Sequence, residues 1–296
     1  MENKKVLVGM SGGVDSAAAA LLLQEAGYEA VGCTLRLYGG GDAGQEGSCC
    51  SLEDTEDARS VARRLGMDFF AFNFSELFRR QVMDDFVASY QAGRTPNPCI
   101  QCNRHVKFEA LLRRADALDI PLVATGHYAR VDRDEVTGRW RLLRGMDPKK
   151  DQSYVLYPLS QGQLSRLLLP VGGYGKAEIR ALAEAWGLCN AAKPDSQDIC
   201  FIPDGDYAAF LQRYGGVELA PGDFVDAAGR VLGRHRGLPC YTTGQRRGLG
   251  VSAGRPLYVL RKDEAANTVV LGYASLRDGD IPGLAEALSG AWRGAR

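Results

Sequence analysis

The chain has 296 residues, 45% of them apolar and 24% charged, with 36 basic and 36 acidic side chains. This composition is typical of a globular protein and excludes a largely disordered chain. A net charge of zero argues against a protein coated in nucleic acid, and the longest strongly apolar stretch, residues 17–23, is too short to span a bilayer. The start of the chain shows no signal-peptide pattern, so we expect a cytoplasmic protein without membrane association.

The first part of the chain alternates apolar runs of strand length with longer segments typical of helices. We expect strands at residues 6–10, 30–37, 68–74 and 122–125, and helices at 17–26, 52–65, 76–91 and 103–118. Gly27 and Gly66 are placed to end two of these helices, whereas Ser51 and Ser75 are placed to begin two others. Strands that alternate with helices imply parallel pairing, so this part predicts a doubly wound α/β fold.

The pattern changes beyond about residue 203. Short strand-like runs separated by Gly and Pro follow at 223–227, 230–233, 257–260 and 268–271. We therefore place a catalytic α/β domain at 1–204 and a small β-rich domain at 205–277. Residues 278–296 show no convincing pattern and are expected to form a short tail.

A glycine-rich segment lies between the first predicted strand and the first predicted helix. It comprises residues 9–16, Gly-Met-Ser-Gly-Gly-Val-Asp-Ser. Glycines let backbone N–H groups approach a phosphate, and the following helix directs its positive end to the same place. The spacing is neither that of a Walker A loop nor that of a dinucleotide fingerprint. The alternative is a tight turn that merely needs glycine.

Eight cysteines in a chain expected to be cytoplasmic suggest metal, redox or catalytic thiols. Cys99 and Cys102 form a CxxC pair just before a predicted helix, which would favour the Cys102 thiolate. Cys200 lies in a polar loop. The pair could also be a zinc half-site, a redox pair or simply packed thiols, but no second CxxC or His pair at zinc-finger spacing is present. The expected small buried hydrophobes are Cys33, Cys189 and Cys240.

A basic stretch lies in the predicted β-rich domain. Residues 229–262 contain eight Lys or Arg, including Arg246 and Arg247, and no Asp or Glu. Such a surface could attract a polyanion, or it could be an ordinary solvated face.

Residues 11–16 resemble the signature of the PP-loop ATP pyrophosphatases. Five further blocks, at 93–108, 124–130, 149–156, 195–202 and 241–250, resemble the tRNA-specific 2-thiouridylases (the MnmA family) and occur in that family's order. The resemblance runs from residue 6 to about residue 272. It implies a doubly wound sheet of the PP-loop, adenine-nucleotide-binding type, followed by a small β-rich domain.

The resemblance also implies an activity. The enzyme would use ATP and Mg²⁺ to adenylate the C2 carbonyl oxygen of the wobble uridine of tRNA, releasing pyrophosphate. Sulfur would come from a persulfide on Cys200, supplied by a cysteine desulfurase or a sulfur-relay protein. Cys102 would be the second catalytic thiol, leaving a Cys102–Cys200 disulfide. The expected substrates are the tRNAs for Glu, Gln and Lys.

The binding residues are likewise implied by the resemblance. Those expected to bind ATP are Gly9, Met10, Ser11, Gly12, Gly13, Val14, Asp15, Ser16, Leu35 and Gly126. Those expected to touch the target base are Asn97, Pro98 and Cys99. Those expected to bind tRNA are Lys150, Asp151 and Gln152, to which the basic stretch adds Arg246 and Arg247.

Two departures from the family pattern matter. Many members carry Asp where this chain has Cys99, so Cys99, Cys102 and Cys200 could instead hold a [4Fe–4S] cluster that binds hydrosulfide. Only about 24 residues follow residue 272, where relatives usually continue into a C-terminal β-barrel. We expect this barrel to be largely missing, which places more of the tRNA binding on the basic stretch or on another protein.

Two other functions compete with this interpretation. One is a PP-loop thiolase or ligase that acts on another RNA base or on a small molecule. The other is a non-catalytic nucleotide or metal sensor, which the intact loop and the two thiols argue against.

Overall fold

The structure is a computed structural model that describes residues 4–38, 52–191, 193, 199–252, 254 and 256–272. Ser51, Cys49, Cys50, residues 195–198, Arg255 and the expected tail at 278–296 therefore lie outside the described residues. The chain divides into two compact units: unit 1 comprises residues 1–88 and 96–206, and unit 2 comprises 89–95 and 207–296. The domain boundary expected at 204–205 stays a prediction.

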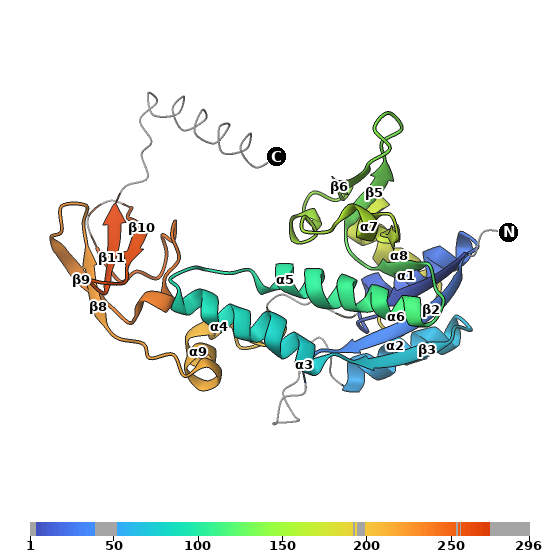
Figure 1. Ribbon diagram of the computed structural model, residues 1–296, viewed down its shortest axis with the longest axis horizontal. Helices are drawn as coiled ribbons and strands as arrows, with labels where there is room; N and C mark the ends of the chain where they lie inside the picture. The colour runs from blue at the N-terminus through green and yellow to red at the C-terminus, as the bar shows by residue number, and fades with distance from the viewer. Residues whose placement is uncertain are drawn as a thin grey trace. The chain divides into compact units, whose positions relative to one another are not determined.

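Unit 1 is built on a five-stranded parallel sheet (Figure 1), which confirms the predicted doubly wound fold. Its strand order is β3-β2-β1-β4-β7. The strands are β1 (Lys5–Gly9), β2 (Glu29–Arg36), β3 (Phe69–Asn73), β4 (Leu122–Thr125) and β7 (Leu167–Leu168). The chain adds β2 and β3 on one side of β1 and β4 on the other, so the order reverses between β1 and β4, where such folds bind ligands.

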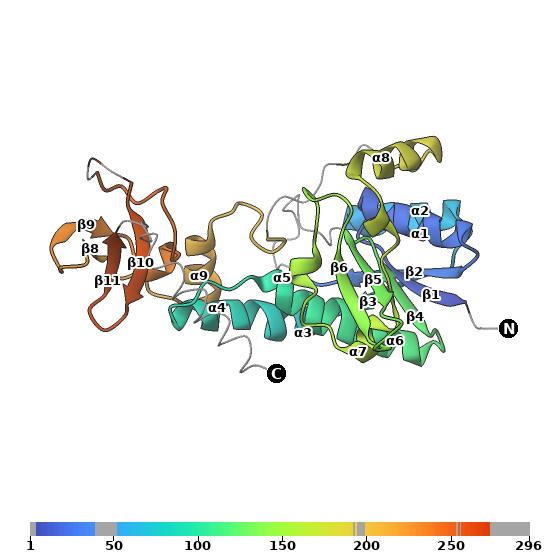
Figure 2. The same cartoon turned by 90° about the horizontal axis from the view of Figure 1, so that it is seen from above.

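Helices cover both faces of this sheet (Figure 2). One face carries α1 (Val14–Glu25) and α2 (Leu52–Arg64), with α8 (Lys176–Ala185) packed outside α1. The other face carries α5 (Pro98–Gln101), η2 (Cys102–Ala110) and α6 (Leu111–Ala117). Val6, Leu7 and Val8 of β1 are fully buried because the strand is covered on both sides.

Two expected helices differ from the prediction. The one expected at 76–91 consists of α3 (Ser75–Phe78), a π-helical turn η1 (Arg79–Met83) and α4 (Asp84–Gln91). Ser75 does not cap it, because its hydroxyl donates to the Asn73 side chain, at 2.7 Å. The one expected at 103–118 begins earlier, at Pro98, because proline suits a first helical position.

Several shorter elements of unit 1 were not predicted. An antiparallel hairpin joins β5 (Ala129–Arg133) to β6 (Trp140–Arg144). Short helical turns follow as η3 (Ser153–Val155), α7 (Gln161–Leu164) and η4 (Pro170–Gly173). Within the described residues, no helix is long and apolar enough to cross a membrane.

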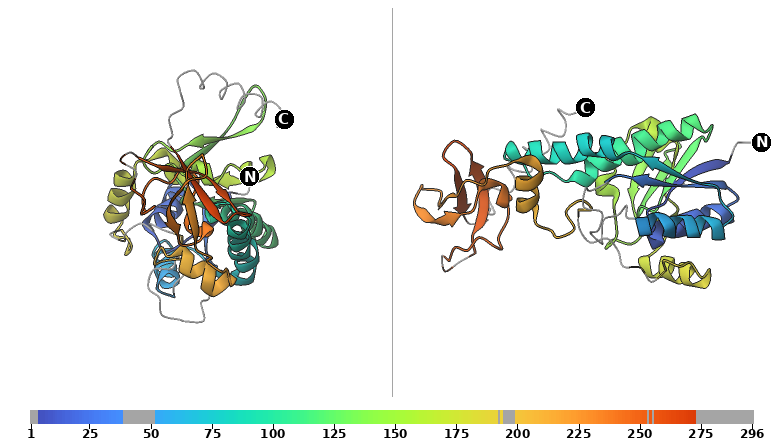
Figure 3. Two further views of the ribbon diagram at one scale, coloured as in Figure 1. Left: turned by 90° about the vertical axis from the view of Figure 1, so that its left-hand side faces the viewer. Right: turned by 90° about the horizontal axis from the view of Figure 1, so that it is seen from below.

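Unit 2 contains a four-stranded sheet of order β10-β11-β8-β9 (Figure 3, orange to red), which confirms a β-rich region after the α/β part. The strands are β8 (Gly222–Val225), β9 (Val231–His235), β10 (Tyr258–Asp263) and β11 (Thr268–Gly272). Helix α9 (Tyr207–Gly215) and the turn η5 (Leu238–Cys240) belong to the same unit. Its apolar core is formed by Phe224, Tyr241, Leu249, Leu257, Val259, Val269 and Leu271.

Candidate nucleotide and sulfur-transfer site

The glycine-rich segment forms the turn from β1 into α1, at the point where the strand order reverses. Gly12 has a φ of +77°, which favours glycine, and Gly13 is the N-cap residue of α1. No side chain caps this helix end. Because the first-turn amides of a helix have no partner within the helix, an uncapped N-terminus offers them to an anion.

Two serines brace the turn from inside. The Ser11 amide donates to Ser16 Oγ at 3.1 Å, and Ser16 Oγ donates to the Gly13 carbonyl at 3.0 Å. The two hydroxyl oxygens lie 3.4 Å apart. Ser16 is buried. Its hydroxyl therefore holds the loop shape, while Ser11, which is exposed, remains the better placed to meet a ligand.

Two glycines allow close backbone approach around this turn. A Cβ atom added to Gly12 would lie 2.8 Å from Asp54 Cα, and one added to Gly126 would lie 2.6 Å from the Ser16 amide nitrogen. Gly126 directly follows β4, the neighbour of β1. Both positions therefore need glycine for close packing around the loop, independently of any contact between the Gly126 backbone and a nucleotide.

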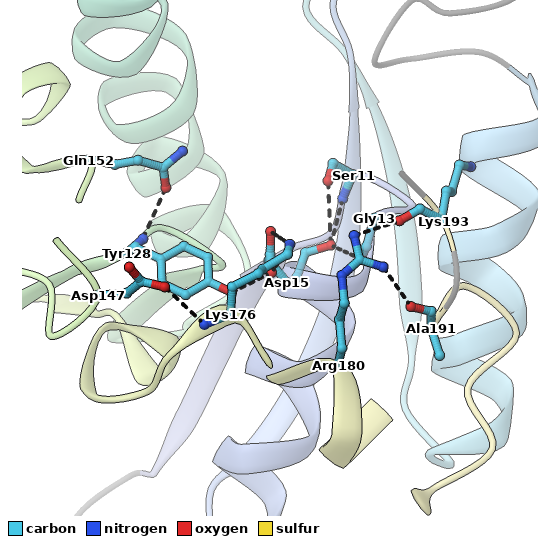
Figure 4. A network of polar contacts seen from close by, with 11 residues as sticks. Ser11, Gly13, Asp15, Tyr128, Asp147, Gln152, Lys176, Arg180, Ala191 and Lys193 are labelled. Atoms are coloured by element: carbon cyan, nitrogen blue, oxygen red, sulfur yellow. Dashed lines mark hydrogen bonds and ion pairs between the residues drawn. The ribbon is translucent and has the colours of Figure 1, made fainter. Parts of the chain in front are cut away.

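Asp15 lies in an ion pair that the sequence did not predict (Figure 4). The Lys176 ammonium donates to both Asp15 carboxylate oxygens, at 2.7 and 2.8 Å, and the Tyr128 hydroxyl donates to Oδ1 at 2.7 Å. Lys176 is the first residue of α8 and follows Asp15 by 161 positions. The phosphate loop thus has a lysine beside it, although no lysine follows the glycines in sequence.

The same network reaches the turn that joins β6 to η3. Asp147 accepts from the Lys176 amide at 3.2 Å, and Gln152 Oε1 accepts from the Tyr128 amide at 3.0 Å. The amide bonds from Lys176 and Lys149 hold the pKa of Asp147 below its ordinary value. The phosphate loop and this turn are therefore connected through two separate side chains.

Asp151 caps this turn from inside. Its carboxylate accepts from the Gly145 amide at 2.9 Å and from the Ser153 hydroxyl at 3.0 Å. Burial raises the pKa of Asp151, but the hydrogen bonds from Gly145 and Ser153 outweigh this effect and hold it below the ordinary value. The side chains of Asp151 and Gln152 thus support the turn.

A second polar cluster links α2, α8 and the segment that leads to Cys200. The Lys193 ammonium donates to Asp54 and Asp57, each at 2.7 Å, and Arg180 donates to the carbonyls of Ala191 and Lys193, each at 3.1 Å. Burial lowers the pKa of Lys193, but the hydrogen bonds to the two carboxylates outweigh it and hold the pKa above its ordinary value.

Asn190 attaches the same segment to the phosphate loop. Its side-chain amide donates to the Gly12 carbonyl at 3.0 Å, and the residue is 3% exposed. Asn190 and Lys193 therefore hold the chain after α8 at two points, one on the loop and one on α2.

The CxxC pair lies inside a helix rather than before one, which corrects the prediction. Asn97 is the N-cap residue and accepts the Cys99 amide at 3.0 Å, so Cys99 lies in the first turn. Cys102 is the first residue of the π-helical segment η2 and is buried. The helix N-terminus therefore acts on Cys99, which is exposed, more directly than on Cys102.

The residues beside the two proposed catalytic thiols contact consecutive positions of one helix. Gln101, before Cys102, donates to Asp85 at 3.3 Å. Phe201, after Cys200, packs edge-on against Phe86 with ring centroids 5.5 Å apart, and against Phe78 at 5.7 Å. Asp85 and Phe86 both belong to α4. The two thiol segments are thus supported by the same helical turn.

Cys102 is buried, Cys200 is half-buried and Cys99 is exposed. Among the described residues, no three His, Cys, Asp or Glu side chains are grouped closely enough to hold a metal ion. A [4Fe–4S] cluster on Cys99, Cys102 and Cys200 stays a prediction.

Comparison with known proteins settles the family. The family model described as the tRNA methyl transferase HUP domain matches residues 4–204, and the tRNA methyl transferase PRC-barrel domain matches 208–273. The tRNA-specific 2-thiouridylase MnmA of Carboxydothermus hydrogenoformans is 53% identical over 92% of this chain and 75% of its own length. That of Heliobacterium modesticaldum is 54% identical over 90% of this chain and 70% of its own length. The chain belongs to the MnmA family.

Solved structures with similar folds include a 4-thiouridine synthetase–RNA complex with bound ATP. It is 17% identical to this chain, with a TM-score of 0.42, and the match covers 67% of this chain and 45% of the synthetase chain.

The other residues expected to bind ATP or tRNA lie partly in the core of unit 1 and partly on the surface of unit 2. Leu35 is buried near the end of β2, and Met10 is buried after β1 with its amide bonded to the Cys33 carbonyl at 2.7 Å. Arg246 and Arg247 are exposed in unit 2, in a turn braced by Gln245, whose side chain donates to the Arg247 carbonyl at 2.9 Å. These two arginines are thus presented to solvent by a fixed backbone.

Four further residues, three thiols and one imidazole, differ in how deeply they are buried. Cys33 is fully buried, and burial raises the pKa of its thiol far above the ordinary value. Cys189, after α8, is exposed, and Cys240, the last residue of η5, is only half-buried, so the expectation of buried thiols is wrong for both. His127 is 8% exposed, within 2.8 Å of the Thr125 hydroxyl, and burial lowers its pKa to about 3.

Proposed function

We propose that this MnmA-family chain is a tRNA-uridine 2-sulfurtransferase that activates the C2 carbonyl of the wobble uridine with ATP. The observation that carries the proposal is the joint support of the two thiol segments by α4, in the unit that also contains an uncapped, glycine-lined helix start. Activation and sulfur delivery need such a pair of neighbouring sites. Family membership supports tRNA as the substrate.

In the first step, the uridine C2 oxygen attacks the α-phosphorus of ATP. The bond from that phosphorus to the pyrophosphate oxygen breaks, pyrophosphate leaves, and the N3 proton is released. The residues proposed to hold the phosphates are 9–16, and Leu35 and Gly126 would meet the adenosine. Mg²⁺ would enter with ATP, because its usual ligands in such sites are substrate phosphates and waters, with one or two carboxylates of the protein. A poor leaving group, the carbonyl oxygen, is thereby converted into AMP.

In the second step, the outer sulfur of a Cys200 persulfide attacks C2. The C2–O bond breaks and AMP leaves with that oxygen. The Cys102 thiolate then attacks the Cys200 sulfur, and the electron pair of the old S–S bond passes to the sulfur on C2. A proton returns to N3, the thione is complete, and a Cys102–Cys200 disulfide remains.

The balance requires two reagents besides ATP. The sulfane sulfur is reduced to the thione while two thiols are oxidised, so an external dithiol must reduce the disulfide after each turnover. A cysteine desulfurase or relay protein must renew the persulfide. The alternative route, in which Cys99, Cys102 and Cys200 would hold a [4Fe–4S] cluster that binds hydrosulfide, stays a prediction, and no step is derived through it.

The proposed tRNA contacts come from both units. Asn97, Pro98 and Cys99 would lie against the target base at the start of α5, where Asn97 and Cys99 are exposed and Pro98 is buried. Lys150 and its turn in unit 1, and Arg246 and Arg247 in unit 2, would neutralise backbone phosphates. The tRNAs for Glu, Gln and Lys are the proposed substrates.

A reconstitution tests the proposal. Protein, ATP, Mg²⁺, a persulfide-generating cysteine desulfurase, dithiol and unmodified glutamate tRNA are mixed, and 2-thiouridine is measured by mass spectrometry of the digested RNA. We expect product with the native chain, none with Cys200→Ala or Cys102→Ala, and full product with the control Cys189→Ala. Pyrophosphate release without tRNA would favour a small-molecule acceptor and contradict the proposal. Product from Cys200→Ala would refute the persulfide route.

A further inference from the structure

Two tyrosines after the β6–η3 turn expose most of their surface. Tyr154 is 61% exposed and Tyr157 is 68% exposed, whereas Val155 and Leu156 between them are buried. Tyr154 lies within the 3₁₀ helix η3, and Tyr157 lies two residues beyond its end. Both phenol rings are close in sequence and open to solvent. Exposed neighbouring aromatic rings are unusual on a surface that meets only water.

The base of this pair is rigid. Val155 and Leu156 anchor it in the interior, and the Asp151 carboxylate holds the preceding turn through the Gly145 amide and the Ser153 hydroxyl. Gln152 connects it to Tyr128, and through that residue to Asp15 of the phosphate loop. The rings are therefore presented at a fixed place relative to the nucleotide loop.

The charges around the pair favour an anionic ligand. Lys149 is exposed on this turn, and Arg144, at the end of β6, is exposed and paired with Asp151 at 3.4 Å. The carboxylates of Asp147 and Asp151 also accept hydrogen bonds from backbone amides. A flat aromatic surface bordered by cations fits unstacked nucleobases, whose faces stack on the rings while the phosphates meet the cations.

We propose that Tyr154 and Tyr157 form a stacking platform for unpaired bases of an RNA loop, with Lys149 contacting its phosphates. The proposal rests on the proposed function and adds to it the residues that hold the RNA beside the phosphate loop. No hydrogen-bonding readout is involved, so the platform tolerates different bases and adds affinity more than sequence specificity.

The test measures tRNA binding by fluorescence anisotropy over a series of salt concentrations. Tyr154→Ala and Tyr157→Ala should each weaken binding about 5- to 150-fold, with an unchanged salt slope, because a stacked base contributes that range of affinity. Tyr→Phe at either position should bind as the native chain does, because the ring is kept. Lys149→Ala should lower the salt slope by about one.

Trp186→Ala, which removes another exposed aromatic ring at the end of α8, is the matched control and should bind normally. If both Tyr→Ala variants bind tRNA with the affinity of the native chain, the platform is wrong and the rings would instead contact a protein. The proposed thiolation activity would be unaffected by that result. Native protein that binds tRNA but makes no 2-thiouridine would overturn the proposed function while the platform stands. Absence of any tRNA binding by the native chain would overturn both.

Discussion

The charge balance at the phosphate loop depends on a single pair, Asp15 and Lys176. Their contact distances of 2.7 and 2.8 Å place one negative and one positive group beside the helix start that would receive a triphosphate. A carboxylate alone at this place would repel ATP, and the lysine offsets it. Tyr128 fixes the geometry by its own hydrogen bond to Asp15.

Lys176→Met should therefore raise the Kd for ATP by about tenfold or more, because it leaves the Asp15 charge uncompensated. Lys176→Arg, which keeps the charge, should lose less. The double variant Asp15→Asn with Lys176→Met should bind ATP better than Lys176→Met alone, since the repelling carboxylate is gone. Isothermal titration with ATP measures all three, and additive losses in the double variant would contradict this charge argument.

At this scale, sequence reasoning located the loop but not its partner. Gly12 and Gly13 could be recognised because a tight turn from a strand into a helix needs glycine. Ser16 was expected to bind ATP, and its role in bracing the turn was not predicted. Lys176 carries no such local signal. It is the first residue of an ordinary amphipathic helix. It reaches Asp15 only because α8 packs on α1 in the tertiary structure, and the local sequence does not reveal that packing.

At the scale of elements, the chain after α8 contacts both α2 and the phosphate loop. Lys193 bridges Asp54 and Asp57, while Asn190 holds the Gly12 carbonyl. Gly12 itself lies against Asp54. The phosphate loop, α2 and the two residues Asn190 and Lys193 therefore share contacts, and we expect these contacts to help keep a persulfide on Cys200 close to the activated base.

Lys193→Met should uncouple the two half-reactions. Without the ammonium, Asp54 and Asp57 repel each other and the thiol segment loses an anchor. We expect the pyrophosphate released per 2-thiouridine formed to rise several-fold from about one, because activated uridine is hydrolysed before sulfur arrives. Lys193→Arg is the control and should restore most of the coupling. A proportional fall of both products would instead indicate a purely structural role for Lys193.

Strands and helices with strong patterns were predicted well, and weakly patterned ones were not. The strand β4 was predicted at its observed bounds because Leu122–Thr125 is an apolar run before Gly126. The β5–β6 hairpin was not predicted because Ala129–Arg133 and Trp140–Arg144 mix apolar and charged residues, so neither forms a continuous apolar run. Pairs such as Arg141 with Asp132 stabilise it. The strand β7 has only two residues, too few for any periodicity.

The start of the CxxC helix was misplaced for a similar reason. Pro98 is typical of a loop, but proline is also a favoured first residue of a helix. Only the tertiary position of the segment decides between the two. The thiol that lies exposed in the first turn of the helix is therefore Cys99, whereas the sequence had favoured Cys102 as the thiol nearest the helix N-terminus.

At the scale of the whole molecule, each unit contains one buried, uncharged histidine. His127 of unit 1 lies against the Phe108 ring and the Thr125 hydroxyl. His235 of unit 2 contacts the Asn267 carbonyl at 3.1 Å with Nε2, while Nδ1 accepts the Gly237 amide at 3.1 Å. Protonation at Nδ1 would break the Gly237 bond. Burial lowers the pKa of His235, although the Asn267 carbonyl and Asp223 oppose this.

Both units should therefore lose stability in acid. An unfolded histidine titrates near pH 6.5, whereas the pKa of folded His127 is about 3, so the unfolded state binds more protons below pH 6.5. The stabilisation is complete above about pH 7.5 and declines as pH falls, by at most about 2 kcal/mol between pH 6.5 and 5 from His127. The same sign holds for His235.

Amide hydrogen exchange resolved by peptide measures each unit separately and does not assume that both unfold in one transition. Protection in β4 and its neighbours should fall between pH 6.5 and 5 beyond the intrinsic pH effect on exchange, and His127→Gln should remove that fall in unit 1 alone. His235→Gln should do the same for β8 and β11 in unit 2 alone. If His127→Gln also removed the fall in unit 2, the two units would have to unfold together, and the division of acid sensitivity between two independent histidines would be wrong.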